Sequence, residues 1–243
     1  MTISENVTRV KETIAAAALA AGRDPGEIRL VAASKMNDAG RIREAIAAGV
    51  DCCGENRVQE MVEKHAQGAY AGASLHFIGH LQKNKVKQVV GLAELIHSAD
   101  SLELLRVIDR CAAQRGLRQD VLLEVNIGEE AAKSGFHAGE IPEILAACGQ
   151  FSALRVRGLM AVPPICAAPE ENRPFFLRMK QLFVDNGRKK YDNVSMDFLS
   201  MGMTGDYAEA IACGATLVRI GTGIFGPRDY SGQRQQESLE ASP

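Results

Sequence analysis

Residues 218–229, VRIGTGIFGPRD, decide between two α/β folds for this chain. Gly221, Gly223 and Gly226 spell G-x-G-x-x-G, the pattern of a dinucleotide-binding Rossmann unit. Such a unit also needs a helix that opens within the glycines and an acidic ribose-binding residue about 20 positions further on. The sequence continues only to Pro243, through a polar stretch without a strand pattern. We therefore expect no Rossmann unit, and these glycines need another role.

Short apolar segments alternate with amphipathic segments along the rest of the chain. Strand patterns lie at residues 27–34, 50–56, 75–81, 94–100, 120–128, 154–163, 194–202 and 216–226. Helical patterns lie at residues 38–49, 57–68, 82–91, 101–116, 138–150, 171–187 and 206–215. About eight strand–helix units in a chain of 243 residues predict a single (β/α)8 TIM barrel. A doubly wound sheet alternates in the same way, but it usually has a Gly-rich first turn, whereas the first turn here is SKMND.

One further helix is expected ahead of the barrel. Thr2 and Glu5 have the spacing of a capping box, and the segment that they open is too charged for a signal sequence. We expect the barrel to span residues 1–230 as the only domain, and residues 231–243 to form a frayed polar tail.

Composition excludes several kinds of partner. The net charge is −2, aromatic residues make up 5% and Trp is absent, which argues against nucleic acid and anionic membrane surfaces. No apolar run is long enough to span a membrane. The six cysteines include no C-x-x-C pair, which predicts reduced thiols in a cytoplasmic protein. His76 and His80 would lie about 13 Å apart on one strand, so they cannot share an ion and we expect no metal site.

The barrel predicts where the functional site lies, because sites of this fold gather at the C-terminal ends of the strands. The residues at those ends are Ser34, Lys35, Glu55, Asn56, His80, Ser98, Asp100, Asn126, Met160, 201–204 and 219–222. Lys35 follows small apolar residues, and desolvation there favours the neutral amine that a Schiff base requires. A solvated lysine at the start of a loop is the alternative interpretation.

Arg219 is the second distinctive residue. It alternates with Val218 and Ile220, so it points into the barrel if those two pack against the helices. A guanidinium inside the barrel needs a partner. That partner is either a buried carboxylate, such as Glu124 or Asp197, or an acceptor on a bound ligand.

The glycines of the opening stretch fit a phosphate site. The loops after the seventh and eighth strands commonly bind phosphate in this fold, and glycine lets the backbone approach closely. Backbone N–H groups of SMGMTGD and IGTG would converge there with the hydroxyls of Ser200, Thr204 and Thr222. Thr204 or Asp206 can also cap the next helix. A lysine, an inward arginine and a phosphate site together fit pyridoxal 5′-phosphate (PLP).

The chain resembles the pyridoxal phosphate homeostasis proteins, which are related to the N-terminal barrel of alanine racemase. The resemblance rests on LVAASK, GVDCCGENRVQE, LHFIGHLQKNK, VLLEVNIGEEAAKSGF, RGLMAVPP and FLSMGMTGDYAEAIACGATLVRIGTGIFGPR, in order along nearly the whole chain. It implies that Lys35 carries PLP as an internal aldimine, that Arg219 faces the pyridine nitrogen and that Asn56 lies beside the ring. Around the phosphate it places Met203, Thr204, Gly221 and Thr222.

Two further features bear on the site. His80, at the end of the third expected strand, is expected to line the pocket. After the lysine the chain reads MND, where the family usually has TKP with a second basic residue. Lys133 in AAKSGF is a second lysine that matches the family and that would lie near the mouth of the barrel. The alternative is that it is an exposed lysine on a loop.

Two classes of function fit these features. The first is a non-enzymatic carrier without catalytic residues, which holds PLP for intracellular homeostasis and has PLP-dependent apo-enzymes as candidate recipients. The second is an amino-acid racemase. Racemases of this fold take a tyrosine base from an additional β-domain that this sequence lacks, and Arg219 would make the ring a poor electron sink. A third alternative, a Schiff-base aldolase acting on a phosphosugar, would use the same lysine and phosphate site. An absorbance spectrum distinguishes it, because an aldolase would be colourless. We expect the carrier, as a cytoplasmic monomer.

Overall fold

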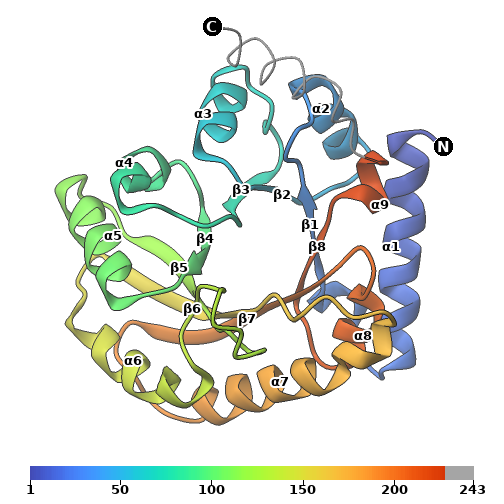
Figure 1. The fold of residues 1–243 in the computed structure, drawn as a ribbon. Helices are drawn as coiled ribbons and strands as arrows, with labels where there is room; N and C mark the ends of the chain where they lie inside the picture. The colour runs from blue at the N-terminus through green and yellow to red at the C-terminus, as the bar shows by residue number, and fades with distance from the viewer. Residues whose placement is uncertain (228–243) are drawn as a thin grey trace, which may run out of the picture.

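Eight parallel strands close into one barrel, as the sequence predicts (Figure 1). The computed structural model describes residues 1–227, so the expected domain end at residue 230 and the tail at 231–243 lie outside the described residues. Each strand pairs with the next, and β8 returns to β1 with Arg219 opposite Val31. The strands are β1 (Arg29–Ala33), β2 (Cys52–Glu55), β3 (Ser74–Phe77), β4 (Leu95–Ala99), β5 (Gln119–Glu124), β6 (Leu154–Met160), β7 (Val194–Met203) and β8 (Leu217–Ile220).

Helices surround the barrel (Figure 1). The extra helix α1 (Ile3–Ala20) begins at the expected capping box of Thr2 and Glu5, and it packs against α8 and α9. The other helices are α2 (Ala39–Ala47), α3 (Val58–Ala66), α4 (Val86–Val89), α5 (Leu102–Gln114), α6 (Ile141–Ala147), α7 (Arg173–Gly187), α8 (Tyr207–Ala212) and α9 (Thr222–Phe225). Among residues 1–227, the structure has no helix long and apolar enough to cross a membrane.

Alternation along the strands divides the apolar core into two layers. The inner layer fills the barrel and consists of Val31, Cys52, Leu95, Leu122, Met160 and Leu217. The outer layer lies between the strands and the helices, and it includes Val218 and Ile220 on β8. Because those two neighbours face outward, Arg219 points into the barrel, as its sequence position predicts.

Several expected elements are shorter in the structure, and two of them also change in kind over part of their length. The strand pattern at residues 216–226 ends at Ile220, and the one-turn helix α9 follows, because Gly221 turns the chain away from the extended conformation. The helical pattern at residues 82–91 becomes the 3-10 turn η2 (Lys83–Lys85) followed by α4, which has a single turn. Only Val86 and Val89 of α4 are buried, so its apolar face supports no longer helix.

Candidate functional site

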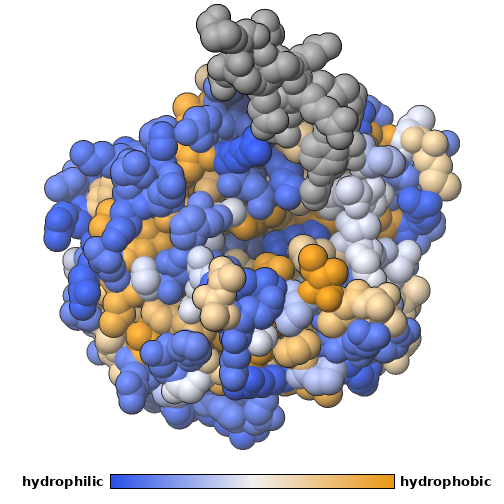
Figure 2. Space-filling view, viewed as in Figure 1, coloured by the Kyte–Doolittle hydropathy of each residue, from blue (hydrophilic) through white to orange (hydrophobic). Residues whose placement is uncertain are grey.

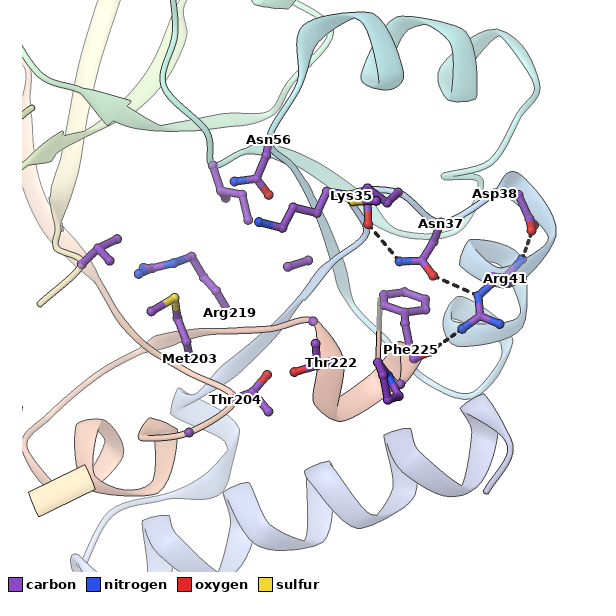
Figure 3. A pocket seen from close by; sticks show the side chains of 18 residues that line it. Lys35, Asn37, Asp38, Arg41, Asn56, Met203, Thr204, Arg219, Thr222 and Phe225 are labelled. Carbon is purple, nitrogen blue, oxygen red and sulfur yellow. Dashed lines mark hydrogen bonds between the residues drawn. The ribbon is translucent and has the colours of Figure 1, made fainter. Parts of the chain in front are cut away.

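A cavity of about 600 Å³ opens at the C-terminal end of the barrel. Figure 2 views this end of the molecule, and Figure 3 shows the cavity from close by. Of the residues that the sequence predicts for the site, those that line the cavity are Lys35, Asn56, Met203, Thr204, Arg219, Gly221 and Thr222. The side chains of Lys35, Asn56 and Arg219 point into the same space (Figure 3).

The backbone on both sides of Lys35 is held by two charged groups, the buried Lys64 and the half-buried Glu60. Lys64 Nζ donates to the carbonyl oxygen of Ser34 at 3.1 Å, and the Met36 N–H donates to Glu60 Oε2 at 2.8 Å. Met36 itself has a φ of 62°, so the chain turns sharply just after the lysine. The lysine is therefore presented on a turn that is fastened at each of its neighbours.

A buried carboxylate organises these contacts. Glu55 Oε1 accepts from Ser34 Oγ at 2.6 Å, from Lys64 Nζ at 2.9 Å and from the Tyr70 hydroxyl at 3.0 Å. Its side chain is fully buried, and burial together with Glu55 raises the pKa of Tyr70 above its usual range. Burial acts to raise the pKa of Glu60, but bonds from Met36 and Lys64 bring it below its usual value. We call Ser34, Glu55, Glu60, Lys64 and Tyr70 the Glu55 cluster.

Arg219 is held by neutral acceptors. Its Nη1 donates to Ser200 Oγ at 2.6 Å and its Nη2 donates to the Ala161 carbonyl at 2.9 Å. Burial lowers the pKa of the guanidinium to about 10, while Glu124 and Asp206 act in the opposite direction, so it stays charged at neutral pH. The carboxylate partners expected from the sequence were Glu124 and Asp197. Glu124 acts on it only through charge, and Asp197 instead pairs with Arg157 at 2.5 Å.

A pair of buried histidines lies behind Arg219. His97 Nδ1 is 3.0 Å from Ser200 Oγ, and His97 Nε2 is 3.0 Å from His76 Nδ1. From the sequence, His76 was weighed only beside His80, and its contact with His97 was not predicted. The available signal was the spacing of β3 and β4, where His76 pairs with Leu95 and His97 follows two residues later on the same face.

The two glycine turns meet as the sequence predicts. Thr204 Oγ1, after β7, accepts from the Gly223 N–H, after β8, at 3.4 Å. A Cβ at Gly223 would lie 3.2 Å from Thr204 Cγ2 in the other turn and 2.8 Å from Ile220 Cγ2 in its own, so the close approach of the turns favours a glycine there. On the outer side, Asn6 Nδ2 of α1 donates to the Ile224 carbonyl of α9 at 2.9 Å. The extra helix therefore supports the second turn.

Asp206 has a different role from the expected cap. It precedes α8, but its side chain makes no capping bond to that helix. Instead its carboxylate accepts from the Met203 N–H at 2.7 Å and from Asn172 Nδ2 at 2.8 Å. It therefore fastens the β7–α8 turn to the segment before α7. Thr204 also does not cap α8, because its bond goes to Gly223.

Several other predicted residues lie away from the cavity wall. His80 does not line it. His80 lines a neighbouring hollow, where its Nδ1 is 3.2 Å from Asp100 Oδ2. Ser200 is fully buried behind Arg219. Lys133 is partly exposed on its loop and lies 2.6 Å from Glu130. Within residues 1–227 there is no group of three or more His, Cys, Asp and Glu that could hold a metal ion.

A basic side chain that was not predicted from the sequence lies beside the MND segment. Arg41, on α2, lines the cavity and donates from Nε to Asn37 Oδ1 at 2.9 Å. It also bonds to the carbonyl of Phe225 at the end of α9 (Figure 3). Although no basic residue follows Lys35 directly, a guanidinium is present on that side of the cavity. The signal available was its position one turn into the helix after Asp38.

The site combines an amine, a guanidinium and two hydroxyl-bearing turns around one space. An amine can form a bond with an aldehyde, while a guanidinium can only donate hydrogen bonds. Hydroxyls and glycine N–H groups suit a phosphate. The cavity volume is within the usual range for a small organic ligand, about 300–1,000 Å³. The arrangement thus fits a compact ligand with an aldehyde, an acceptor atom on its ring and a phosphate.

Known proteins share this barrel over most of its length. The alanine racemase, N-terminal domain family matches residues 4–229. The "Pyridoxal phosphate homeostasis protein" of Pseudomonas aeruginosa is 42% identical over 232 residues, which cover 94% of this chain and 97% of that protein. The protein of the same name from Aquifex aeolicus is 40% identical over 230 residues, covering 95% and 100%.

A solved structure extends this comparison. The structure of PipY from Synechococcus elongatus with PLP bound is 30% identical to this chain and has a TM-score of 0.80. The match covers 93% of this chain and 100% of that chain.

Proposed function

This chain belongs to the pyridoxal phosphate homeostasis proteins, within the alanine racemase N-terminal domain family, and on that premise we propose that it binds PLP for intracellular PLP homeostasis. The observation that carries the proposal is that Lys35 and Arg219 face one cavity. The two glycine turns, which are linked by a hydrogen bond, line the same cavity. A bound PLP would supply an aldehyde, whose carbon condenses with a primary amine to form a C=N bond and release one water.

Each group of the cavity has one task in this proposal. Lys35 provides the amine, and the Glu55 cluster keeps its turn in place. Met203, Thr204, Gly221 and Thr222 line the same part of the site and would surround the phosphate of a bound PLP. Asn56, which also lines the cavity, would lie beside the ring. His80 has no task in it, because it faces the neighbouring hollow.

Arg219 favours a carrier over an enzyme. It remains charged at neutral pH and can only donate, so it would keep the ring nitrogen of a bound PLP unprotonated. An unprotonated ring withdraws electrons weakly, which leaves little stabilisation for a carbanion on a bound amino acid. The barrel itself is shared with enzymes, so the absence of catalysis rests on Arg219 and on the names of the relatives. An amino-acid racemase is the alternative.

The proposal also covers location and partners. We place the protein in the cytoplasm, which is supported by six free cysteines, none of them in a disulfide. PLP-dependent apo-enzymes are the proposed recipients of the cofactor, and we propose that the protein acts as a monomer.

The binding proposal is tested by fixing the cofactor with borohydride. Wild-type protein loaded with PLP should acquire one reduced, irreversible label, and peptide mapping should place it on Lys35. Lys35→Ala should remove both the label and the long-wavelength absorbance of lysine-bound PLP. Lys133→Ala, on the partly exposed loop, is the matched control and should keep both. A label on any other lysine in the wild-type protein would contradict the assignment.

The carrier proposal is tested with alanine. PLP-loaded protein mixed with L- or D-alanine should show no racemisation above that of free PLP. Arg219→Glu would let the ring nitrogen take a proton, and racemisation should then rise. Wild-type turnover of about one per second or faster, within the usual range of enzymes, would replace the carrier with the racemase.

A further inference from the structure

Four buried polar side chains form a continuous chain through the interior of the barrel. Arg219, Ser200, His97 and His76 have side chains on β8, β7, β4 and β3, and none is more than 5% exposed. Successive contacts are 2.6 Å, 3.0 Å and 3.0 Å. We call these four residues the histidine chain. It starts at the cavity that Lys35 lines and ends at His76, beside a second, smaller cavity of about 160 Å³.

The hydrogen bonds of the histidine chain fit one arrangement of donors and acceptors. A guanidinium has no acceptor, so Ser200 Oγ accepts from Arg219. The single hydroxyl proton of Ser200 then has His97 Nδ1 as its acceptor. His97 consequently carries its proton on Nε2, and it donates to His76 Nδ1. Every contact is satisfied when both imidazoles are neutral and both carry the proton on Nε2.

The surroundings keep both imidazoles neutral. Burial lowers the pKa of His76 to about 4, with Glu94 raising it and Arg29 lowering it. Burial also lowers the pKa of His97 well below its usual value, and the neighbouring His76 and Arg219 add to this effect. The smaller cavity at the far end is lined by charged groups of both signs, Arg29, Glu94, Asp120 and Arg157.

We propose that His97, supported by His76, is a positioning residue for Arg219: through the Ser200 hydroxyl it fixes the guanidinium that faces the ring nitrogen of bound PLP. This inference rests on the proposed function, because it takes PLP as the occupant of the cavity. His97 and His76 do not line that cavity, so neither touches the ligand. Their effect reaches it only through Ser200 and Arg219.

Packing alone does not account for the pair. The rest of the inner layer is apolar, with Leu95 two residues before His97 on β4 and Leu122 on β5. An apolar residue at position 97 would avoid the cost of burying a polar ring. It would also leave the Ser200 hydroxyl without the acceptor that holds the rotamer of this side chain, so the oxygen that Arg219 contacts would no longer be fixed. The pair therefore suits orientation of Arg219 better than it suits stability.

The first measurement needs no cofactor. The imidazole ¹⁵N spectrum of the cofactor-free protein at neutral pH should show His76 and His97 as neutral rings protonated on Nε2. A proton on Nδ1 of His97, or a charged ring at either position, would overturn the inference, because Ser200 would then receive a second donor.

The second measurement uses PLP labelled with ¹⁵N on its ring and fixed on Lys35 with borohydride. His97→Leu should move the ring ¹⁵N resonance away from its wild-type position, because Arg219 loses its fixed acceptor. His97→Asn should keep the resonance near wild type, since an amide oxygen can replace Nδ1 as the acceptor for Ser200. Leu95→Ala is the matched control on the same strand. It should lower stability without moving the resonance.

The outcomes separate the two proposals. If the wild-type protein acquires no label on Lys35, the proposed function fails and the inference fails with it. If the label forms and His97→Leu leaves the ring resonance unchanged, only the inference is overturned. Should His97→Leu not fold, Ser200→Ala, which removes one oxygen, takes its place with the same expected shift.

Discussion

Removing the cation from the Glu55 cluster should destabilise the barrel strongly. The perturbation is Lys64→Met, which keeps an unbranched side chain as far as Cε and removes the ammonium. Glu55 is fully buried, so its charge would lose the bond at 2.9 Å without any access to water. Loss of one partner of a buried ion pair typically costs about 3–5 kcal/mol. Ser34 and Tyr70 continue to donate to the same oxygen, which places the expected loss near the lower limit, about 3 kcal/mol.

A double variant isolates the charge effect. Glu55→Gln combined with Lys64→Met removes both charges and leaves an amide that Ser34 and Tyr70 can still contact. Replacing both partners of a buried pair is often close to neutral, but the double variant still loses the bonds from Lys64 to Glu60 and to the Ser34 carbonyl. It should therefore be less destabilised than Lys64→Met, and the difference between the two variants measures the cost of leaving the Glu55 charge unpaired. Equilibrium urea unfolding of the cofactor-free protein measures both. If Lys64→Met costs no more than the double variant, Glu55 is not held by charge pairing and the reasoning is refuted.

Three further predictions concern the phosphate turns and the histidine chain. Thr222→Val should weaken the binding of PLP roughly tenfold, about 1.4 kcal/mol, and hardly affect the binding of unphosphorylated pyridoxal. Equal losses of affinity in titrations with both ligands would show that Thr222 matters for folding only. Gly202→Ala should cost about 1–3 kcal/mol in urea unfolding, because φ is 88° and the new Cβ would lie 2.5 Å from Ala210 Cβ; an unchanged midpoint would contradict this. Burial lowers the pKa of His76 from 6.5 to about 4, so only the unfolded chain gains a proton as pH falls through this range. His76 should therefore account for about 2 kcal/mol of the stability lost between about pH 7 and 5, and buried His97, whose pKa is also lowered, adds to that loss. His76→Gln should make the dependence in urea unfolding shallower by about that amount; an equally steep variant would assign the loss to other groups.

The barrel could be predicted because its strands leave a clear pattern in the sequence. Parallel barrel strands are buried on both faces, so each reads as a short apolar run between helical segments. The fold then located Lys35 and Arg219 at strand ends, where side chains point into the mouth. The direction of Arg219 followed from Val218 and Ile220 alone, because side chains alternate along a strand.

Features that depend on contacts between elements could not be predicted in this way. The bond between His97 and Ser200 joins β4 to β7, 103 positions apart, and nothing local to either residue indicates it. Arg41 reaches Phe225 only because α2 and α9 flank the same strand ends. The end of β8 was missed for a local reason. The apolar residues at 220, 224 and 225 continue a strand-like pattern through the turn at Gly221.

Most of the polar side chains that the described part of the chain buries serve positions around one cavity. The Glu55 cluster fastens the turn of Lys35, the histidine chain holds Arg219, and Asp206 with Asn172 fastens the β7 turn. A barrel selected for stability alone would favour apolar residues there, since buried ion pairs seldom add net stability. Polar groups placed against that rule are expected where function requires fixed geometry. The three points that they fix are those that an aldehyde, a ring nitrogen and a phosphate would need, which is the strongest reason to place PLP in this cavity.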